Sequence, residues 1–263
     1  MLAFIHIPKT AGTTLHKILS HQYPRTFIRH DSDGPPDAAL AKQIREADTQ
    51  LIMGHFSVGL HRFIPEIRYV TCLRKPEARL LSHYHHALND PAHYLHQEVV
   101  SKNLSLADYI ASGLSGELAN GMTRMLAGID NFHHGEVNAE TLANAKSNIE
   151  NLFDGVILSE SFDPSLLLLA DSLHWKTPYY IRRKVGRYTS GSRRLDEDAR
   201  TAIAEHNRFD CELYEWANTR FESQASSIPD LGDRTLRFQR ANRVQGKAIF
   251  CLRELKSRMQ PKQ

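Results

Sequence analysis

Apolar runs and helical repeats alternate along the chain, and this alternation predicts an α/β fold. Five short stretches are rich in apolar and β-branched residues and are expected to be strands: 3–7, 26–29, 50–53, 67–73 and 155–158. Between most of them, apolar positions recur at helical spacing. Strands that alternate with helices pair in parallel and carry helices on both faces of the sheet. We therefore expect an α/β fold with a central, mainly parallel sheet flanked by helices.

Single residues indicate where some helices begin. Asp37 suits the N-cap of a helix that runs to about residue 47. Pro76 suits the first position of a helix that runs to about residue 88, where Glu77 favours the helix dipole. The other expected helical regions are 14–23, parts of 93–151, 164–173, and one long helix over 195–221.

The turn between the first strand and the first helix has the composition of an anion-binding loop. It contains Lys9 and Gly12, and its hydroxyl groups come from Thr10, Thr13 and Thr14. Backbone N–H groups at a helix N-terminus attract anions, and the lysine adds a positive charge. In the Walker A motif the lysine follows the last glycine, whereas here Lys9 precedes Gly12. We therefore expect the loop to bind phosphate or sulfate in another way than an ordinary ATPase does.

A second positively charged loop follows the strand at 67–73. Arg74 comes at the end of the strand, and Ser82 lies two turns into the helix that Pro76 begins. An arginine can bind a phosphate through two parallel hydrogen bonds. Taken alone, Arg74 fits an ordinary surface salt bridge better. Together with the first loop, it indicates two anion sites in one fold, which suits a nucleotide with phosphates at both ends.

A histidine follows a third strand. Gly54 and His55 come directly after the strand at 50–53. Ligands of parallel α/β sheets gather at the carboxyl ends of the strands, so the three loops are expected to converge on one site. His6 is expected to pack in or beside the first strand.

Composition and charge are those of an ordinary globular protein. The chain has 263 residues, of which 41% are apolar and 24% are charged, and its formal net charge is +3. So small an excess does not indicate nucleic-acid binding, and no nucleic-acid partner is expected. The three cysteines lie far apart, so reduced thiols are expected rather than a zinc site or disulfides. No signal peptide or transmembrane stretch is evident, so a cytoplasmic location is expected.

The C-terminal part of the chain is more basic than the rest. Residues 229–263 contain nine Lys and Arg side chains against three Asp and Glu. We therefore expect a main domain over 1–225 and a basic helical tail over 226–263. Two interpretations of the tail stay open: a solvated helix or frayed end, and a surface for a polyanion or an acidic membrane. The sequence does not indicate the oligomeric state.

Two of these motifs resemble a known enzyme family. FIHIPKTAGTTL at 4–15 and YVTCLRKPEARLLSHY at 69–84 are similar to motifs of the sulfotransferases that use 3′-phosphoadenosine 5′-phosphosulfate (PAPS). The similarity is greatest to the membrane-bound carbohydrate group, which includes the heparan sulfate and uronyl 2-O-sulfotransferases and their bacterial relatives. It extends to MGHFS at 53–57 and, more weakly, to 120–128 and 210–221, but not to the basic tail.

The resemblance implies a three-layer, P-loop-like fold and a role for each motif. In the family the first loop binds the 5′-phosphosulfate, which assigns that role to Lys9, Thr10, Ala11, Gly12, Thr13 and Thr14. The second loop binds the 3′-phosphate, which assigns that role to Arg74 and Ser82. The MGHFS segment corresponds to the one with the catalytic histidine, so His55 becomes the candidate general base.

The implied reaction moves a sulfuryl group from PAPS to a hydroxyl group of an acceptor, expected to be a saccharide or glycoconjugate. By analogy with phosphoryl transfer, the displacement is in line and the transition state is loose. Lys9 would stabilise the charge that develops on the leaving phosphate, and His55 would take the proton of the hydroxyl. Lys9 and Arg74 supply positive charge, so no metal is expected.

Several residues keep a second interpretation. Four histidines are rival bases: His61, His83, His85 and His86. The last three also have a spacing that could form a metal-binding side of a helix, although no second pair of ligands is near. Arg79 either contacts the cofactor or pairs with Glu77 or another neighbour. Arg124 either reaches an acidic acceptor or lies on a solvated helix surface, and residues 184–187 loosely resemble a cofactor-covering loop.

Two other classes of function stay open. A kinase or nucleotidase would use the first loop for ATP, but it would need a Walker-type Gly-Lys-Ser/Thr and a magnesium-binding acid at a strand end, and neither is evident. A non-catalytic module would keep the nucleotide loop and bind a polyanion through the basic tail. The presence of both Lys9 and His55 weighs against such a module.

Overall fold

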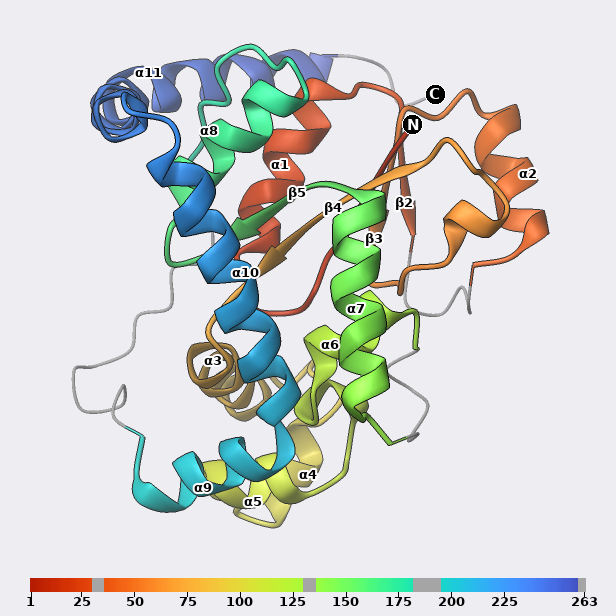
Figure 1. Ribbon diagram of the computed structural model, residues 1–263, viewed down its shortest axis with the longest axis vertical. Coiled ribbons are helices and arrows are strands. Elements are labelled where there is room, and N and C mark those ends of the chain that lie inside the picture. Colours follow the sequence, from red (N-terminus) through yellow and green to blue (C-terminus); the bar gives the residue numbers. More distant parts are fainter. Residues whose placement is uncertain (30–35, 130–135, 182–194, 260–263) are drawn as a thin grey trace.

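A five-stranded sheet lies at the centre of the protein (Figure 1). The computed structural model describes residues 1–29, 36–129, 136–181 and 195–259. The strands are β1 (Leu2–Ile5), β2 (Thr26–Arg29), β3 (Leu51–Gly54), β4 (Arg68–Leu73) and β5 (Phe153–Leu158), in the order β2-β3-β1-β4-β5. Every pair of neighbouring strands is parallel. The predicted parallel α/β sheet is confirmed, and all five predicted strands are present.

The central strand is apolar on both faces because helices cover both. All four residues of β1 are buried. Ala3 and Ile5 belong to one core cluster, whereas Leu2 and Phe4 belong to another. Successive side chains of a strand point to opposite faces, so a strand between two helical layers has to be apolar at every position.

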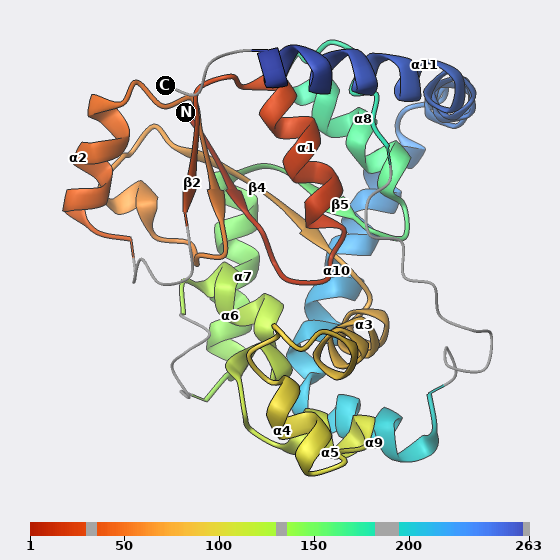
Figure 2. The same ribbon diagram turned by 180° about the vertical axis from the view of Figure 1, so that it is seen from behind.

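Helices form the two outer layers (Figures 1 and 2). The cluster around Phe4 includes residues of α1 (Gly12–Gln22), α8 (Phe162–Ser172) and α11 (Leu231–Met259). The cluster around Ile5 includes residues of α2 (Ala38–Glu46), α6 (Gly121–Ala127), α7 (Ala139–Leu152) and α10 (Arg208–Ser226). The three-layer arrangement implied by the resemblance is therefore present. Within the described ranges, no helix combines the length and apolarity that a membrane crossing requires.

A group of shorter elements lies below the sheet in Figure 1, beyond the carboxyl ends of the strands. It contains α3 (Pro76–Asn89), α4 (His96–Ser101), α5 (Leu106–Ala111), α9 (Glu197–His206) and the 3-10 turn η3 (Gly116–Leu118). These elements share a separate apolar core that includes Leu80 and Tyr109. A second 3-10 turn, η2 (Leu60–Arg62), lies between β3 and β4 in the sequence. The first turn of α3 contains Pro76 and Glu77, as predicted.

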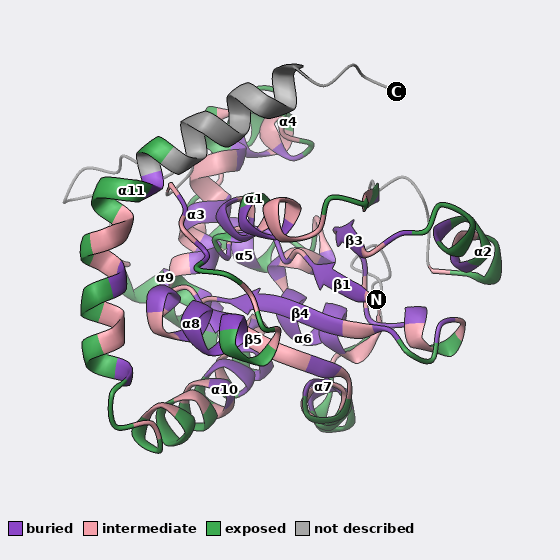
Figure 3. Ribbon diagram, turned by 90° about the horizontal axis from the view of Figure 1, so that it is seen from above, coloured by how far each residue is buried: buried purple, intermediate pink, exposed green. Residues whose placement is uncertain are grey.

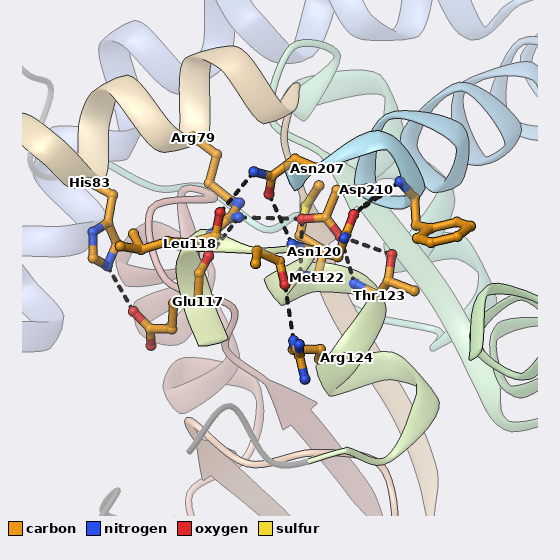
Figure 4. A network of polar contacts seen from close by, with 12 residues as sticks. Arg79, His83, Glu117, Leu118, Asn120, Met122, Thr123, Arg124, Asn207 and Asp210 are labelled. Carbon is orange, nitrogen blue, oxygen red and sulfur yellow. Dashed lines mark hydrogen bonds and ion pairs between the residues drawn. The ribbon is translucent and has the colours of Figure 1, made fainter. Parts of the chain in front are cut away.

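The prediction of one long helix over 195–221 is wrong, because the chain breaks at Asn207 into α9 and α10. Asn207 is fully buried, and its backbone is not helical, with φ −131° and ψ 25°. Its side chain donates to the Leu118 carbonyl at 2.8 Å and accepts from the Asn120 amide at 3.0 Å. In return, the Asn120 side chain accepts from the amides of Phe209 and Asp210 at the start of α10, at 2.9 and 3.1 Å. These side-chain hydrogen bonds satisfy backbone groups at the ends of the helices (Figure 4). The helical spacing of apolar residues does not reveal such bonds, so it does not predict the break.

The first part of α11 packs against α8. Leu231 and Phe238 are buried in the cluster around Phe4. Arg234 forms an ion pair with Asp171 at 2.7 Å, and Gln239 donates to Asp163 at 2.8 Å. In Figure 3, the described part of α11 carries a few buried positions among intermediate and exposed ones. The tail is helical as expected, and its separation from the main domain at residue 225 stays a prediction.

Removing the Phe238 side chain tests whether α11 contributes to the folded core. Loss of a buried phenylalanine side chain costs about 3–5 kcal/mol, so Phe238→Ala should lower the free energy of unfolding by a similar amount. Val244→Ala on the same helix is the matched control, because Val244 is 77% exposed and its truncation should cost at most about 0.5 kcal/mol. Urea denaturation followed by circular dichroism measures both. Equal stability of the two variants would show that α11 adds nothing to the core.

Candidate active site

Three loops converge at the carboxyl edge of the sheet. β1 lies between β3 and β4, and Ile5 at its end pairs with both Gly54 and Thr71. The loops that follow these strands line one cavity of about 1030 Å³, to which they contribute Lys9, His55 and Arg74. Chain segments that lie far apart in the sequence therefore meet at one place, where the direction of the strand order reverses.

The loop after β1 has an unusual backbone. Lys9 and Ala11 both lie in the left-handed region, with φ 68° and 71°. This conformation costs a residue with a Cβ about 1–2 kcal/mol, and such strain concentrates at binding sites. A left-handed residue before a helix turns successive N–H groups towards one point and creates an anion-binding concavity. Ala11 is the N-cap of α1, and among the described residues no side-chain hydrogen bond caps that end of the helix.

Most of the predicted 5′ group faces the cavity, and Thr10 is the exception. The cavity lining includes Lys9, Ala11, Gly12, Thr13 and Thr14. Thr10 is fully buried, and its hydroxyl donates to the Ile7 carbonyl at 2.8 Å. Its side chain therefore stabilises the conformation of the loop from the protein interior.

Neighbouring strands hold the loop in place. The Thr10 carbonyl accepts hydrogen bonds from Ser159 Oγ at 2.7 Å and from the Cys72 thiol. Burial raises the pKa of Cys72 to about 12, so this thiol stays protonated and can donate. Arg74 Nη1 donates to the Lys9 carbonyl at 3.0 Å, which links the first loop directly to the second.

Gly12 is required by the ring of His6. A Cβ atom at residue 12 would lie 1.9 Å from Cδ2 of His6, far inside any permitted contact. His6 stacks on Phe4, with ring centroids 5.5 Å apart, and its ring meets the ring of His55 edge-on at 4.6 Å. His6 thus packs beside the first strand, as expected, and also lines the cavity beside His55.

The residues of the second predicted anion site line the same cavity. Arg74 follows β4 and Ser82 lies on α3, and both line the cavity. Four carboxylates also line it: Glu77, Asp90, Glu117 and Glu160. Glu160 accepts from the Lys75 amide at 3.2 Å and from the Tyr214 hydroxyl at 2.9 Å, and these contacts fix its orientation.

Arg79 has a structural partner. It does not line the cavity, and its side chain is 1% exposed. Nη2 lies 3.3 Å from Asp210 Oδ2 on α10 and donates to the Glu117 carbonyl at 2.9 Å (Figure 4). Of the two interpretations, pairing with a neighbour is the one that the structure supports, and the partner is Asp210 rather than Glu77.

Arg124 belongs to the interior as well. It is 5% exposed on α6, and Nε donates to the Ala119 carbonyl at 3.0 Å. It therefore lies neither on a solvated helix surface nor in the lining of the cavity. The segment 184–187, which resembles a cofactor-covering loop, lies outside the described residues.

The rival histidines separate into two groups. His61 and His85 do not line the cavity, and His61 Nδ1 lies 3.3 Å from the Tyr69 hydroxyl. His83 and His86 do line it. His83 is almost fully buried between the Tyr109 hydroxyl and Glu117, each at 2.7 Å. No metal-binding group of three or more His, Cys, Asp or Glu side chains occurs among the described residues, and the absence of a metal stays a prediction.

The cavity wall also contains residues that the motifs do not indicate, among them His93, Tyr94 and Glu117. Burial alone would raise the pKa of Glu117, but the hydrogen bond from His83 and the charges of His83, His55 and Arg79 hold that pKa at about 2. Burial and the neighbouring imidazoles lower the pKa of His93 to about 4. In the sequence, His93 and Tyr94 are marked only as a His-Tyr pair after the helix end at 89–91, and Glu117 is not marked at all.

The arrangement has the pattern of an α/β protein that binds a phosphorylated nucleotide. A strained, lysine-containing loop opens a helix at the strand-order reversal, and an arginine that follows the neighbouring strand β4 lines the same cavity. A histidine that follows a third strand, β3, lines it as well.

The family follows from comparison with known proteins. The sequence profile of the galactose-3-O-sulfotransferase family matches residues 1–256, and the chain belongs to this family. The resemblance to carbohydrate sulfotransferases is thereby confirmed, although the matching family is named for 3-O rather than 2-O sulfation.

Individual relatives agree with this assignment. Galactose-3-O-sulfotransferase 3 of Homo sapiens is 28% identical over 256 residues, and that of Mus musculus is 28% identical over 258 residues. Each alignment covers 84% of this chain and 56% of the relative, so the chain spans about half the length of the curated relatives it matches. A solved structure, mouse sulfotransferase SULT7A1 complexed with PAP, is 11% identical with a TM-score of 0.43 and covers 82% of this chain and 88% of its own.

Gly12→Ala should weaken the binding of adenosine 3′,5′-bisphosphate, the desulfated form of PAPS, by at least about tenfold, or about 1.4 kcal/mol. The added methyl group would displace either the loop or the ring of His6. Gly232→Ala is the matched control, because nothing lies within 4 Å of a Cβ at that position. Isothermal titration calorimetry gives the dissociation constants.

A double variant tests the cause of that loss. Combining Gly12→Ala with His6→Ala removes the clashing ring, so part of the nucleotide affinity should return. Wild-type affinity in the single Gly12→Ala variant would contradict the steric argument.

Proposed function

We propose that this protein is a PAPS-dependent sulfotransferase that sulfates a hydroxyl group of a carbohydrate. One observation carries the proposal most strongly: Lys9, His55 and the pair Arg74 and Ser82 line a single cavity. Membership of the galactose-3-O-sulfotransferase family supports it independently.

The residues present fit the donor nucleotide. The absence of a side chain at Gly12 lets the loop pack directly on the ring of His6, and the left-handed Lys9 and Ala11 set the course of its backbone. This loop and the Lys9 ammonium would hold the 5′-phosphosulfate. Arg74 and Ser82, which line the same cavity, would hold the 3′-phosphate. PAPS, when bound, supplies the sulfuryl group.

The chain would assist the displacement in two ways. In the reaction a bond forms between sulfur and the acceptor oxygen while the bond between sulfur and the 5′-phosphate oxygen breaks. Lys9 and the N–H groups of the loop stabilise the charge that grows on the departing phosphate oxygen. His55 takes the proton from the acceptor hydroxyl, so that a sulfate ester and adenosine 3′,5′-bisphosphate leave.

The acceptor is proposed to be a galactoside. The support is the name of the matching family and of the human and mouse relatives. A kinase-like protein would instead favour an adenine nucleotide without a 3′-phosphate, and this difference gives the first test.

Calorimetry with adenosine 3′,5′-bisphosphate and with ADP tests the donor. The bisphosphate should bind more tightly, and Arg74→Ala should weaken it about 10- to 100-fold, because a hydrogen-bonded charge contributes about 1.5–3 kcal/mol. Arg25→Ala is the charge-matched control, since Arg25 precedes β2 at the opposite edge of the sheet and pairs with Asp48. Equal or tighter binding of ADP would favour a kinase or nucleotidase.

Replacing His55 tests the general base. His55→Ala should bind adenosine 3′,5′-bisphosphate as the wild type does, yet its turnover with PAPS and a β-galactoside should fall about 10²- to 10⁴-fold. His61→Ala serves as the matched control, because His61 lies outside the cavity lining and should be dispensable. Transfer of ³⁵S from labelled PAPS measures both. Near-normal turnover of His55→Ala would remove His55 from this role.

A further inference from the structure

Part of the cavity wall contains no residue of the nucleotide-binding motifs. Besides the loops that follow the strands, its lining includes His93 and Tyr94 after α3, and Glu117 on η3. A volume of about 1030 Å³ is at the upper end of the range for small-molecule sites, which leaves room for a second ligand beside a nucleotide.

Glu117 presents a charged oxygen to this wall. Its Oε2 atom lies 2.7 Å from His83 Nε2 and accepts from the Tyr94 hydroxyl at 3.2 Å. Both contacts use Oε2, and the other oxygen, Oε1, takes part in neither. The backbone is fixed as well, because the Glu117 carbonyl accepts from Arg79. The carboxylate is therefore ionised, rigidly held and 16% exposed at the cavity.

Tyr94 presents an aromatic face next to that carboxylate. It is 59% exposed, which is unusual for a large aromatic side chain, and it lines the cavity. The ring is fixed by two kinds of contact: one face stacks on His93 with centroids 4.7 Å apart, and the hydroxyl lies 3.0 Å from Ser115 Oγ and 3.2 Å from Glu117 Oε2. A rigid aromatic surface suits a ligand with an apolar face and polar edges.

This wall is adjacent to the residues proposed for catalysis. Lys9 and His55 line the same cavity as His93, Tyr94 and Glu117. In addition, the charge of Lys9 contributes to the lowered pKa of His93, and the charge of His55 contributes to the lowered pKa of Glu117. A ligand on Tyr94 and Glu117 would thus reach towards the cavity region of His55 and Lys9.

We infer that Tyr94 and Glu117 form an acceptor subsite that binds a sugar ring. Tyr94 stacks on the face of the pyranose ring that carries C–H groups, and Glu117 Oε1 accepts a hydrogen bond from a ring hydroxyl that is not sulfated. His83 and His93 position the carboxylate and the aromatic ring. This inference rests on the proposed sulfotransferase activity and adds to it the residues that select the acceptor.

Steady-state kinetics with PAPS and methyl β-galactoside test the subsite. Tyr94→Ala should raise the KM for the galactoside about five- to tenfold, and Glu117→Gln should raise it about tenfold or more. Tyr94→Phe keeps the ring and should stay within about threefold of the wild type. In all three, calorimetry should give an unchanged dissociation constant for adenosine 3′,5′-bisphosphate, which also shows that each variant is folded.

Val100→Ala is the matched control for truncation of an exposed side chain. Val100 is 49% exposed on α4 and does not line the cavity, so its KM values should equal those of the wild type. If the wild type sulfates the galactoside and both Tyr94→Ala and Glu117→Gln have the wild-type KM for it, the proposed subsite is wrong and the proposed function stands. If the wild type binds the bisphosphate but sulfates no sugar, both proposals are overturned.

Discussion

The buried ion pair between Arg79 and Asp210 is the interaction on which the cavity depends. It joins α3 to α10, and the same Asp210 accepts from the amides of Met122 and Thr123 at the start of α6, at 3.1 and 2.8 Å (Figure 4). Arg79 also fixes the Glu117 carbonyl. Removing one partner from such a pair leaves an uncompensated buried charge and costs about 3–5 kcal/mol. The pair therefore fixes both α3, which carries Ser82, and the part of the cavity wall that contains Glu117.

A second constraint keeps the first loop in a conformation that it would not adopt alone. Lys9 and Ala11 carry left-handed strain, and several contacts from neighbouring strands oppose their relaxation. Ser159 holds the Thr10 carbonyl from the end of β5, and Arg74 holds the Lys9 carbonyl from the end of β4. Because Arg74 belongs to the second anion-binding position, the two positions are coupled through a single side chain. Distortion of one loop is transmitted to the other.

Sequence reasoning succeeded where the signal is local. The strands, the loop around Lys9 and the Pro76 helix start each follow from a few consecutive residues, and the carboxyl ends of parallel strands bring their loops together. It failed where the cause lies far away in the chain. The break at Asn207 depends on bonds to Leu118 and Asn120, and Arg79 finds its partner 131 residues further on. Helical periodicity carries no information about such pairs, because each partner alone looks like a polar surface residue.

The environment of the cavity shifts the protonation equilibria of several side chains that line it. Burial lowers the pKa of His86, an effect that the charge of Lys9 reinforces, and a pKa of about 4 keeps His93 uncharged at neutral pH. A pKa of about 2 keeps Glu117 ionised. Lys9 and Arg74 supply positive charge to the cavity, which is also lined by carboxylates, Glu117 among them. A nucleotide with an anionic group at each end is attracted to Lys9 and Arg74 and repelled by the ionised Glu117, so the wall around Glu117 is left for a neutral, hydroxyl-rich ligand.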